Sequence, residues 1–149
     1  MSEPSHVEMD TDERDRFLGT GGTGVLSFAT GGEQAPHSIP VSYGYDARGP
    51  AFFFRLASEP DSEKAPLFDH PVSFVVYRET DDGWKSVEAS GDLERTTDED
   101  IATETLDGLD RVEIPYVDMF ERPLRMIDFE FFRLRPAEIT GRREDPQPE

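Results

Sequence analysis

Residues 37–45 alternate strictly between bulky and small side chains, and this alternation constrains the fold more than any other feature of the sequence. Successive side chains of a β-strand point to opposite faces, so the pattern predicts a strand with one face on a core. The bulky positions are Ile39, Val41, Tyr43 and Tyr45, and the small ones are Ser38, Pro40, Ser42 and Gly44. Because proline cannot donate a ladder hydrogen bond, Pro40 indicates an edge strand, a bulge or an interrupted rim.

The other apolar runs are short and separated by turn residues, a pattern typical of hairpins. Residues 46–49 predict a tight connection to the next strand. Further strands are expected at 25–30, 51–56, 72–77, 84–93 with a bulge at Gly91, and 125–134, with a possible extension at 136–140 after a break. Short helices are expected at 12–18, capped by Thr11, and at 98–109, ended near Gly108.

About six strands in hairpins, with short peripheral helices, indicate a mainly β fold built on an antiparallel barrel. No repeat, linker or second domain is visible, so residues 1–149 are expected to form one domain, with an ordered core at about 10–141. Residues 58–69 are polar and mildly helical, and residues 111–123 remain unassigned. The charged tail at 142–149 is expected to fray.

Several classes of protein are disfavoured by composition. No apolar run approaches the ~20 residues of a membrane-spanning helix. The first residues are acidic and polar rather than basic and apolar, so a cytoplasmic location is expected. Cysteine is absent, which excludes disulfides and thiolate chemistry. We see no GxSxG, P-loop or GxGxxG pattern, and His6, His37 and His70 lack the spacing of metal ligands, so no metal site is predicted.

The charge balance is strongly acidic, with 33 Asp and Glu against 15 Lys and Arg and a net charge of -18. Such a chain should repel nucleic acid and anionic membranes. Ordered blocks of aromatic residues favour a folded domain over a disordered one, and a salt-rich cytoplasm would screen the self-repulsion, because the Debye length is only ~3 Å at 1 M. Lys64 and Lys85 are the only lysines, which raises the question of their roles.

The order of segments resembles the FMN-binding split β-barrel of the pyridoxamine 5′-phosphate oxidase-like superfamily over roughly residues 10–95. The segments that carry the resemblance are residues 24–28, 36–46, 52–55, 62–64, 71–74 and 84–91, with a similar stretch at 138–142. The resemblance implies a split antiparallel barrel and a flavin mononucleotide cofactor. It also implies a homodimer, in which the second subunit closes each flavin site.

The resemblance also implies which residues meet the flavin. Ser62 and Lys64, with Arg55 at the end of the preceding strand, would hold the phosphate. The ring would lie along the small face formed by Ser38, Pro40 and Ser42, with Val41 and Tyr43 facing the opposite side and backbone groups there and on Phe53 and Phe54 at the flavin edge. From the second subunit would come Trp84, Lys85 and Ser86.

Each assignment has a structural alternative. Lys64 could be a solvated helix lysine, the small face of residues 38–42 an irregular edge strand, and Trp84 a core aromatic beside a turn. The vitamin oxidase has an arginine and a lysine where this chain has Ser38 and Tyr43, so pyridoxal phosphate synthesis is not expected.

Three functions remain open. They are a flavin-dependent oxidoreductase with a small-molecule electron donor and acceptor, a non-catalytic flavin-binding or sensing module, and a deazaflavin-dependent reductase. FAD, a deazaflavin and haem are the alternative cofactors.

Overall fold

The computed structural model describes residues 6–30, 32, 34–58, 71–111 and 128–144. The strands are β1 (His6–Glu8), β2 (Gly21–Phe28), β3 (His37–Asp46), β4 (Ala51–Ser58), β5 (Val72–Thr80), β6 (Gly83–Gly91), β7 (Leu93–Thr96), β8 (Asp128–Leu134) and β9 (Glu138–Glu144). The helices are α1 (Thr11–Leu18) and α2 (Thr103–Arg111), and a 3₁₀ turn at Asp98–Asp100 precedes α2. The described part of the chain therefore has more strands than the sequence predicted.

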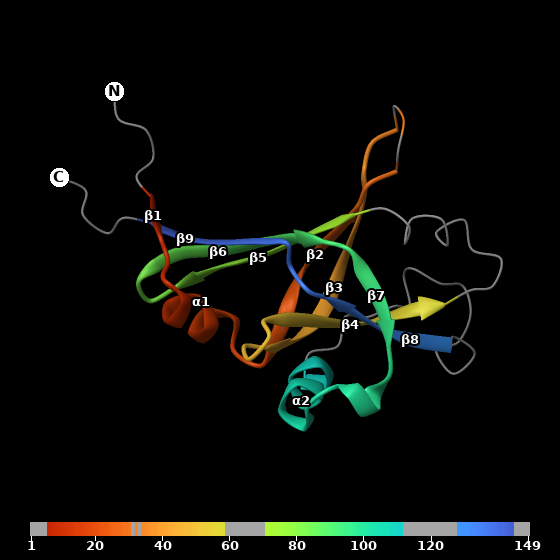
Figure 1. Ribbon diagram of the computed structural model, residues 1–149. Coiled ribbons are helices and arrows are strands. Elements are labelled where there is room, and N and C mark those ends of the chain that lie inside the picture. Colours follow the sequence, from red (N-terminus) through yellow and green to blue (C-terminus); the bar gives the residue numbers. More distant parts are fainter. Residues whose placement is uncertain (1–5, 31, 33, 59–70, 112–127, 145–149) are drawn as a thin grey trace.

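Every strand pair is antiparallel, and the strands form one sheet in the order β1-β9-β6-β5-β2-β3-β4-β8-β7 (Figure 1). Only Asp92 separates β6 from β7, yet β6 pairs with β5 and β9 whereas β7 pairs with β8. The chain therefore bends after Gly91 and crosses between the two halves of the sheet. This crossing rolls the sheet into a split β-barrel, which confirms the predicted fold class.

Gly91, where the sequence predicted a bulge, lies at this bend. A Cβ there would lie 3.0 Å from the carbonyl oxygen of Arg135 and 3.2 Å from the amide nitrogen of Ala137. Glycine is therefore required because another stretch of backbone approaches closely.

The C-terminal prediction was wrong in two respects. Residues 138–144 form a separate strand, β9, which pairs with β6 and β1 instead of extending β8. Arg142 and Arg143, expected in a frayed tail, face Ser86 and Lys85 across the ladder. The hydrogen bonds of two neighbouring strands order this charged segment, and a composition-based argument cannot detect them.

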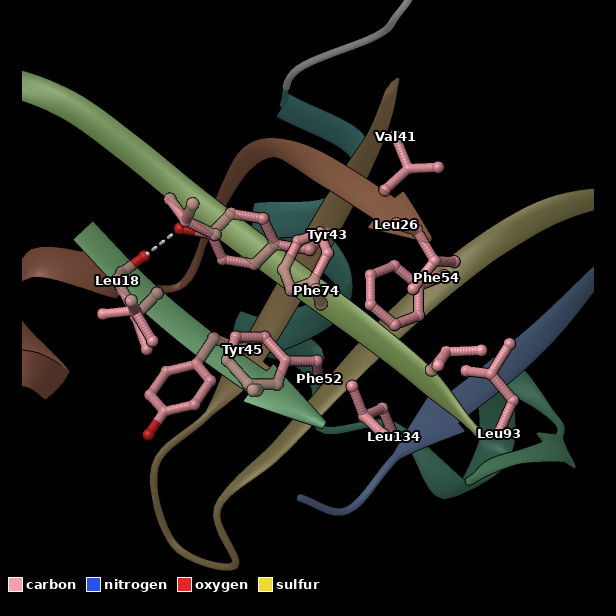
Figure 2. Packing of buried hydrophobic residues seen from close by; sticks show 14 of the residues in the cluster. Leu18, Leu26, Val41, Tyr43, Tyr45, Phe52, Phe54, Phe74, Leu93 and Leu134 are labelled. Atoms are coloured by element: carbon pink, nitrogen blue, oxygen red, sulfur yellow. Dashed lines mark hydrogen bonds between the residues drawn. The ribbon is translucent and has the colours of Figure 1, made fainter. Parts of the chain in front are cut away.

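The interior of the barrel is rich in aromatic side chains (Figure 2). Phe74 lies at the centre, with its ring centroid 4.8 Å from that of Phe54, 5.2 Å from Phe52 and 5.4 Å from Tyr43. These rings meet edge to face, the geometry that adds to the stability gained from burial alone. Val41, Tyr43 and Tyr45 of β3 all point inward, as the alternation predicted.

Helix α1 packs its C-terminal end against the barrel interior, where Phe17 and Leu18 are buried. Asp10, and not Thr11, is its N-cap, because the Asp10 carboxylate accepts a hydrogen bond from the amide of Glu13 at 2.8 Å. The Tyr43 hydroxyl donates to the carbonyl oxygen of Leu18 at 2.9 Å, and burial raises the pKa of Tyr43 to about 12. Tyr43 is therefore a neutral donor that fixes the end of α1.

The predicted second helix also differs from the observed one. Residues 98–100 form a 3₁₀ turn, and α2 runs from Thr103 through Gly108 to Arg111. Gly108 lies inside the helix and is buried, so it does not end the helix as predicted.

Candidate functional site

The middle of the outward face of strands β2, β3 and β5 is lined by uncharged side chains, most of them small. These residues alternate with buried ones such as Leu26, Val41 and Phe74, so they share the side of the sheet that faces away from the core. We call this surface the outer strip, and its members are Thr23, Val25, Ser27, Ser38, Pro40, Ser42, Ser73, Val75 and Tyr77.

The strand register sets the outer strip in rows. One row runs from Ser38 through Ser27 to Ser73, and the hydroxyl oxygens of Ser27 and Ser38 lie 2.7 Å apart. The next row runs from Pro40 through Val25 to Val75. Charged residues make up 32% of the chain, yet on this face of β2, β3 and β5 they lie only at the strand ends, at Asp46 of β3 and Glu79 of β5, beyond the outer strip. The strip is therefore suited to a flat uncharged group or to another protein surface rather than to solvent.

Helix α2 lies against β2 and β3 beside the outer strip (Figure 1). Glycines on both sides let the helix approach the two strands closely. Gly21 and Gly44 face each other across these strands. A Cβ on Gly44 would lie 2.4 Å from the carbonyl oxygen of Thr105, and one on Gly21 would lie 2.3 Å from that of Gly108. Helix and sheet backbones are thus in direct contact, and the helix forms a wall along one end of the strip.

The structure brings together the residues predicted to lie under the flavin ring. Ser38 and Pro40 are exposed, and Ser42 is buried beside α2, all three on the outer strip. Val41 and Tyr43 point into the core, as predicted for the opposite face.

The predicted residues of β4 divide between the two faces. Phe54 lies in the barrel core, whereas Phe53 packs with Ile101 on the outer side. Arg55 alternates with Phe54, so it lies on the outer face with Phe53, and it is half-buried there. Ser62 and Lys64, predicted to hold the phosphate with Arg55, lie outside the described residues, as do positions 112–123 of the unassigned segment.

The three residues predicted to come from the second subunit lie on two different faces of β6. Trp84 and Ser86 point outward, on the face of the outer strip, and Ser86 lies opposite Tyr77. Lys85 points to the other side, where its ammonium lies 3.2 Å from the carboxylate of Glu13 in α1. Arg143 also reaches that carboxylate, at 3.2 Å. The ion pair gives this rare lysine a structural role, and its predicted contact with a cofactor stays a prediction.

Sequence reasoning missed the contributions of β2 and β5. Thr23, Val25, Ser27 and Ser73 complete the outer strip, but their runs show no long alternation of their own. Tyr77, in a stretch expected to have almost no polar face, has 61% of its surface exposed. The strand register brings these residues beside those of β3, and the sequence alone does not predict that register.

Two other kinds of site were searched for in the described residues. No group of three or more His, Asp or Glu side chains there is arranged to hold a metal ion. In the same ranges, no helix is long and apolar enough to cross a membrane.

Comparison with known proteins identifies a family. A sequence model of the family described as pyridoxamine 5′-phosphate oxidase matches residues 10–143. Among curated proteins, the comparison finds no match.

Solved structures with a similar fold cover almost all of the chain. A conserved protein of unknown function from Corynebacterium diphtheriae is 22% identical, with a TM-score of 0.62 over 96% of this chain and 100% of that one. An FAD-binding protein from Mesorhizobium loti is 21% identical, with a TM-score of 0.62 over 95% and 98%. An FAD-binding protein from Mycobacterium smegmatis is 16% identical, with a TM-score of 0.58 over 93% and 100%.

Proposed function

Since the chain belongs to the pyridoxamine 5′-phosphate oxidase family, we propose that it is a flavoprotein that binds FMN on the outer strip and acts as an oxidoreductase. Two copies would form the working unit, with Trp84 and Ser86 of one subunit lying against the flavin held by the other. The bound flavin supplies the electron transfer, and the protein supplies binding and orientation.

The observation that carries the proposal is the uncharged outer strip in a chain of net charge -18. Small side chains at Ser27, Ser38 and Pro40 let a flat ring approach the sheet, and the serine hydroxyls offer hydrogen bonds to its polar edge. Arg55 lies on the same side of the sheet, where a cation is needed for a phosphate. Ser62 and Lys64 would complete the phosphate site.

A non-catalytic flavin-binding module is the second candidate, and one observation favours it. None of the outer-strip residues is an acid or base that titrates near neutral pH, so the strip itself offers no group for proton transfer. Oxidation of a nicotinamide donor by the flavin-loaded protein separates the two candidates. Turnover above that of free flavin supports the oxidoreductase, and its absence supports the binding module.

We expect FMN to bind at one molecule per subunit in molar salt. Trp84 is the only tryptophan, so its fluorescence should fall by energy transfer as the flavin absorption band shifts. Ser38→Tyr would place a ring where the flavin lies and should weaken binding about tenfold or more. FAD titrated in parallel tests which flavin is preferred.

The matched control is Ala47→Tyr, which adds the same ring at an exposed position in the turn after β3. This variant should bind FMN like the natural protein. Equal losses in both variants would show that the outer strip is not the binding surface, and no binding by the natural protein would overturn the proposed function.

The proposed dimer should depend on salt, because two acidic subunits repel each other unless ions screen them. Sedimentation velocity should show a dimer in molar salt that weakens in dilute buffer. Val75→Glu adds a charge at a half-buried position on the outer strip and should give monomers even in molar salt. Ala47→Glu adds the same charge at the exposed turn and should stay dimeric. A dimer unaffected by both dilution of salt and Val75→Glu would place the interface elsewhere.

A further inference from the structure

Three cations lie in one row on the inner face of the sheet. Arg78 of β5 faces Lys85 of β6 across the ladder, and Lys85 in turn faces Arg143 of β9. Lys85 alternates with Val87, which is buried in the core, so the row lies on the core-facing side of the sheet. Like charges that face each other on neighbouring strands repel, so the row weakens the ladder unless an opposite charge compensates it.

Glu13 of helix α1 supplies the compensating charge. Its two carboxylate oxygens reach different strands, because Oε2 lies 3.2 Å from the Lys85 ammonium and Oε1 lies 3.2 Å from the Arg143 guanidinium. Only 13% of the Lys85 side chain and 20% of the Glu13 side chain are exposed, so solvent screens their contact only in part. Asp82 lies 3.9 Å from Lys85 but is 81% exposed and contributes little. Glu13 is therefore the charge that lets Lys85 and Arg143 face each other.

The third cation of the row holds the other end of α1. The Arg78 guanidinium lies 4.1 Å from the centroid of the Phe17 ring and donates a hydrogen bond to the Phe17 carbonyl oxygen. This carbonyl belongs to the last turn of the helix, where the helix dipole is negative. All three cations therefore contact α1, two of them through Glu13 and one through Phe17.

Helix α1 is also tied to the C-terminal strand. The amide of Met9, just before the helix, donates to the carbonyl oxygen of Gly141 at 2.8 Å, and β1 pairs with β9 (Figure 1). We call β1, α1 and β9 together the terminal clasp. β1 and β9 lie at the edge of the sheet, next to β6. They can therefore leave together with the loss of only one strand pair, that of β9 with β6.

We propose that the terminal clasp opens as one unit while the rest of the barrel stays folded, and that the charge of Glu13 holds it closed. The strands from β6 to β7 keep their ladders, and the aromatic rings around Phe74 keep their contacts. Opening leaves β6 as an edge strand. Trp84 and Ser86 lie on the outer side of β6, so opening would lower the flavin affinity of the partner subunit; only this last step rests on the proposed function.

Hydrogen exchange of the full-length, flavin-free protein in molar salt tests the clasp. Glu13→Gln keeps the shape of the side chain but leaves Lys85 and Arg143 facing each other without a carboxylate between them. Protected amides of α1 and β9 should exchange faster by one common factor of about tenfold or more, and those of β2 and β3 should not change. Asp12→Asn is the matched control, because it removes the same charge from an exposed position in the same helical turn.

A second substitution tests whether charge is the cause. Lys85→Gln removes the cation that faces Arg143 across the ladder. Added to Glu13→Gln, it should return the exchange of the clasp to within about threefold of the natural protein. A helix that Glu13→Gln had weakened for another reason would not recover.

Four results would overturn the inference. They are equal exchange in Glu13→Gln and Asp12→Asn, different factors for α1 and β9, unfolding of the whole barrel together with the clasp, and no recovery in the double variant. The measurements use no flavin, so failure of the inference and failure of the FMN titration are distinguishable.

Discussion

Replacing Gly108 with alanine is expected to destabilise the folded protein by about 3 kcal/mol, because α2 has no room for a methyl group at this position. A Cβ on Gly108 would lie 2.0 Å from the carbonyl oxygen of Thr20 and 2.9 Å from the amide nitrogen of Gly21. Both contacts are with backbone, so no side chain can rotate away. The helix would have to lift from β2, although alanine is the better helix former by about 1 kcal/mol.

Lifting α2 would disturb more than one contact. The Thr105 hydroxyl donates to the carbonyl oxygen of Tyr45 at 3.2 Å, and Ile101 packs on Phe53 just before the helix. Loss of the helix from the sheet would expose these groups together. The wall beside Ser42 would move as well, so the variant should also bind flavin more weakly if the outer strip is the site.

Chemical denaturation in molar salt measures the free energy of unfolding. Gly49→Ala is the control, because a Cβ there meets nothing within 4 Å and the substitution should change stability little. If Gly108→Ala is as stable as Gly49→Ala, the backbones of α2 and β2 are not in direct contact.

The sequence predicted the parts of the fold that depend on alternation within one segment. The β3 pattern placed Val41, Tyr43 and Tyr45 in the core, and the tight turn after it gave the β3–β4 hairpin. The prediction failed where contacts with other segments of the chain determine the structure. Arg142 and Arg143 lie in β9 because β6 and β1 supply hydrogen bonds on both sides. Gly108 lies inside α2, where a side chain would collide with the backbone of Thr20.

The residues of the candidate site also differ in whether alternation within one segment predicts them. Ser38, Pro40 and Ser42 could be placed on one face from their alternation alone. Ser27 and Val75 could not, because they join that face only through the registers of β2 with β3 and β5. Trp84, Lys85 and Ser86 were predicted as a group from a family resemblance. Alternation along β6 sends Lys85 to the inner side, where Glu13 holds it.

The second large effect is expected for the cofactor phosphate. Arg55→Gln should weaken FMN binding by about 10- to 100-fold, since a hydrogen bond to a charged group contributes about 1.5–3 kcal/mol. Riboflavin carries the same ring without the phosphate, so its affinity should not change. Titrating both ligands into both proteins therefore separates a lost phosphate contact from damage to the ring site.

Arg133→Gln is the matched control for Arg55→Gln. Arg133 lies on the neighbouring strand β8 and on the same face of the sheet, opposite Phe53, and its guanidinium pairs with Glu94 at 3.4 Å. Both substitutions remove one positive charge from this side of the barrel, so a general change of electrostatic attraction would weaken FMN equally in the two variants. A specific phosphate contact would weaken it in Arg55→Gln alone, and equal losses, or a parallel loss of riboflavin, would remove Arg55 from the phosphate site.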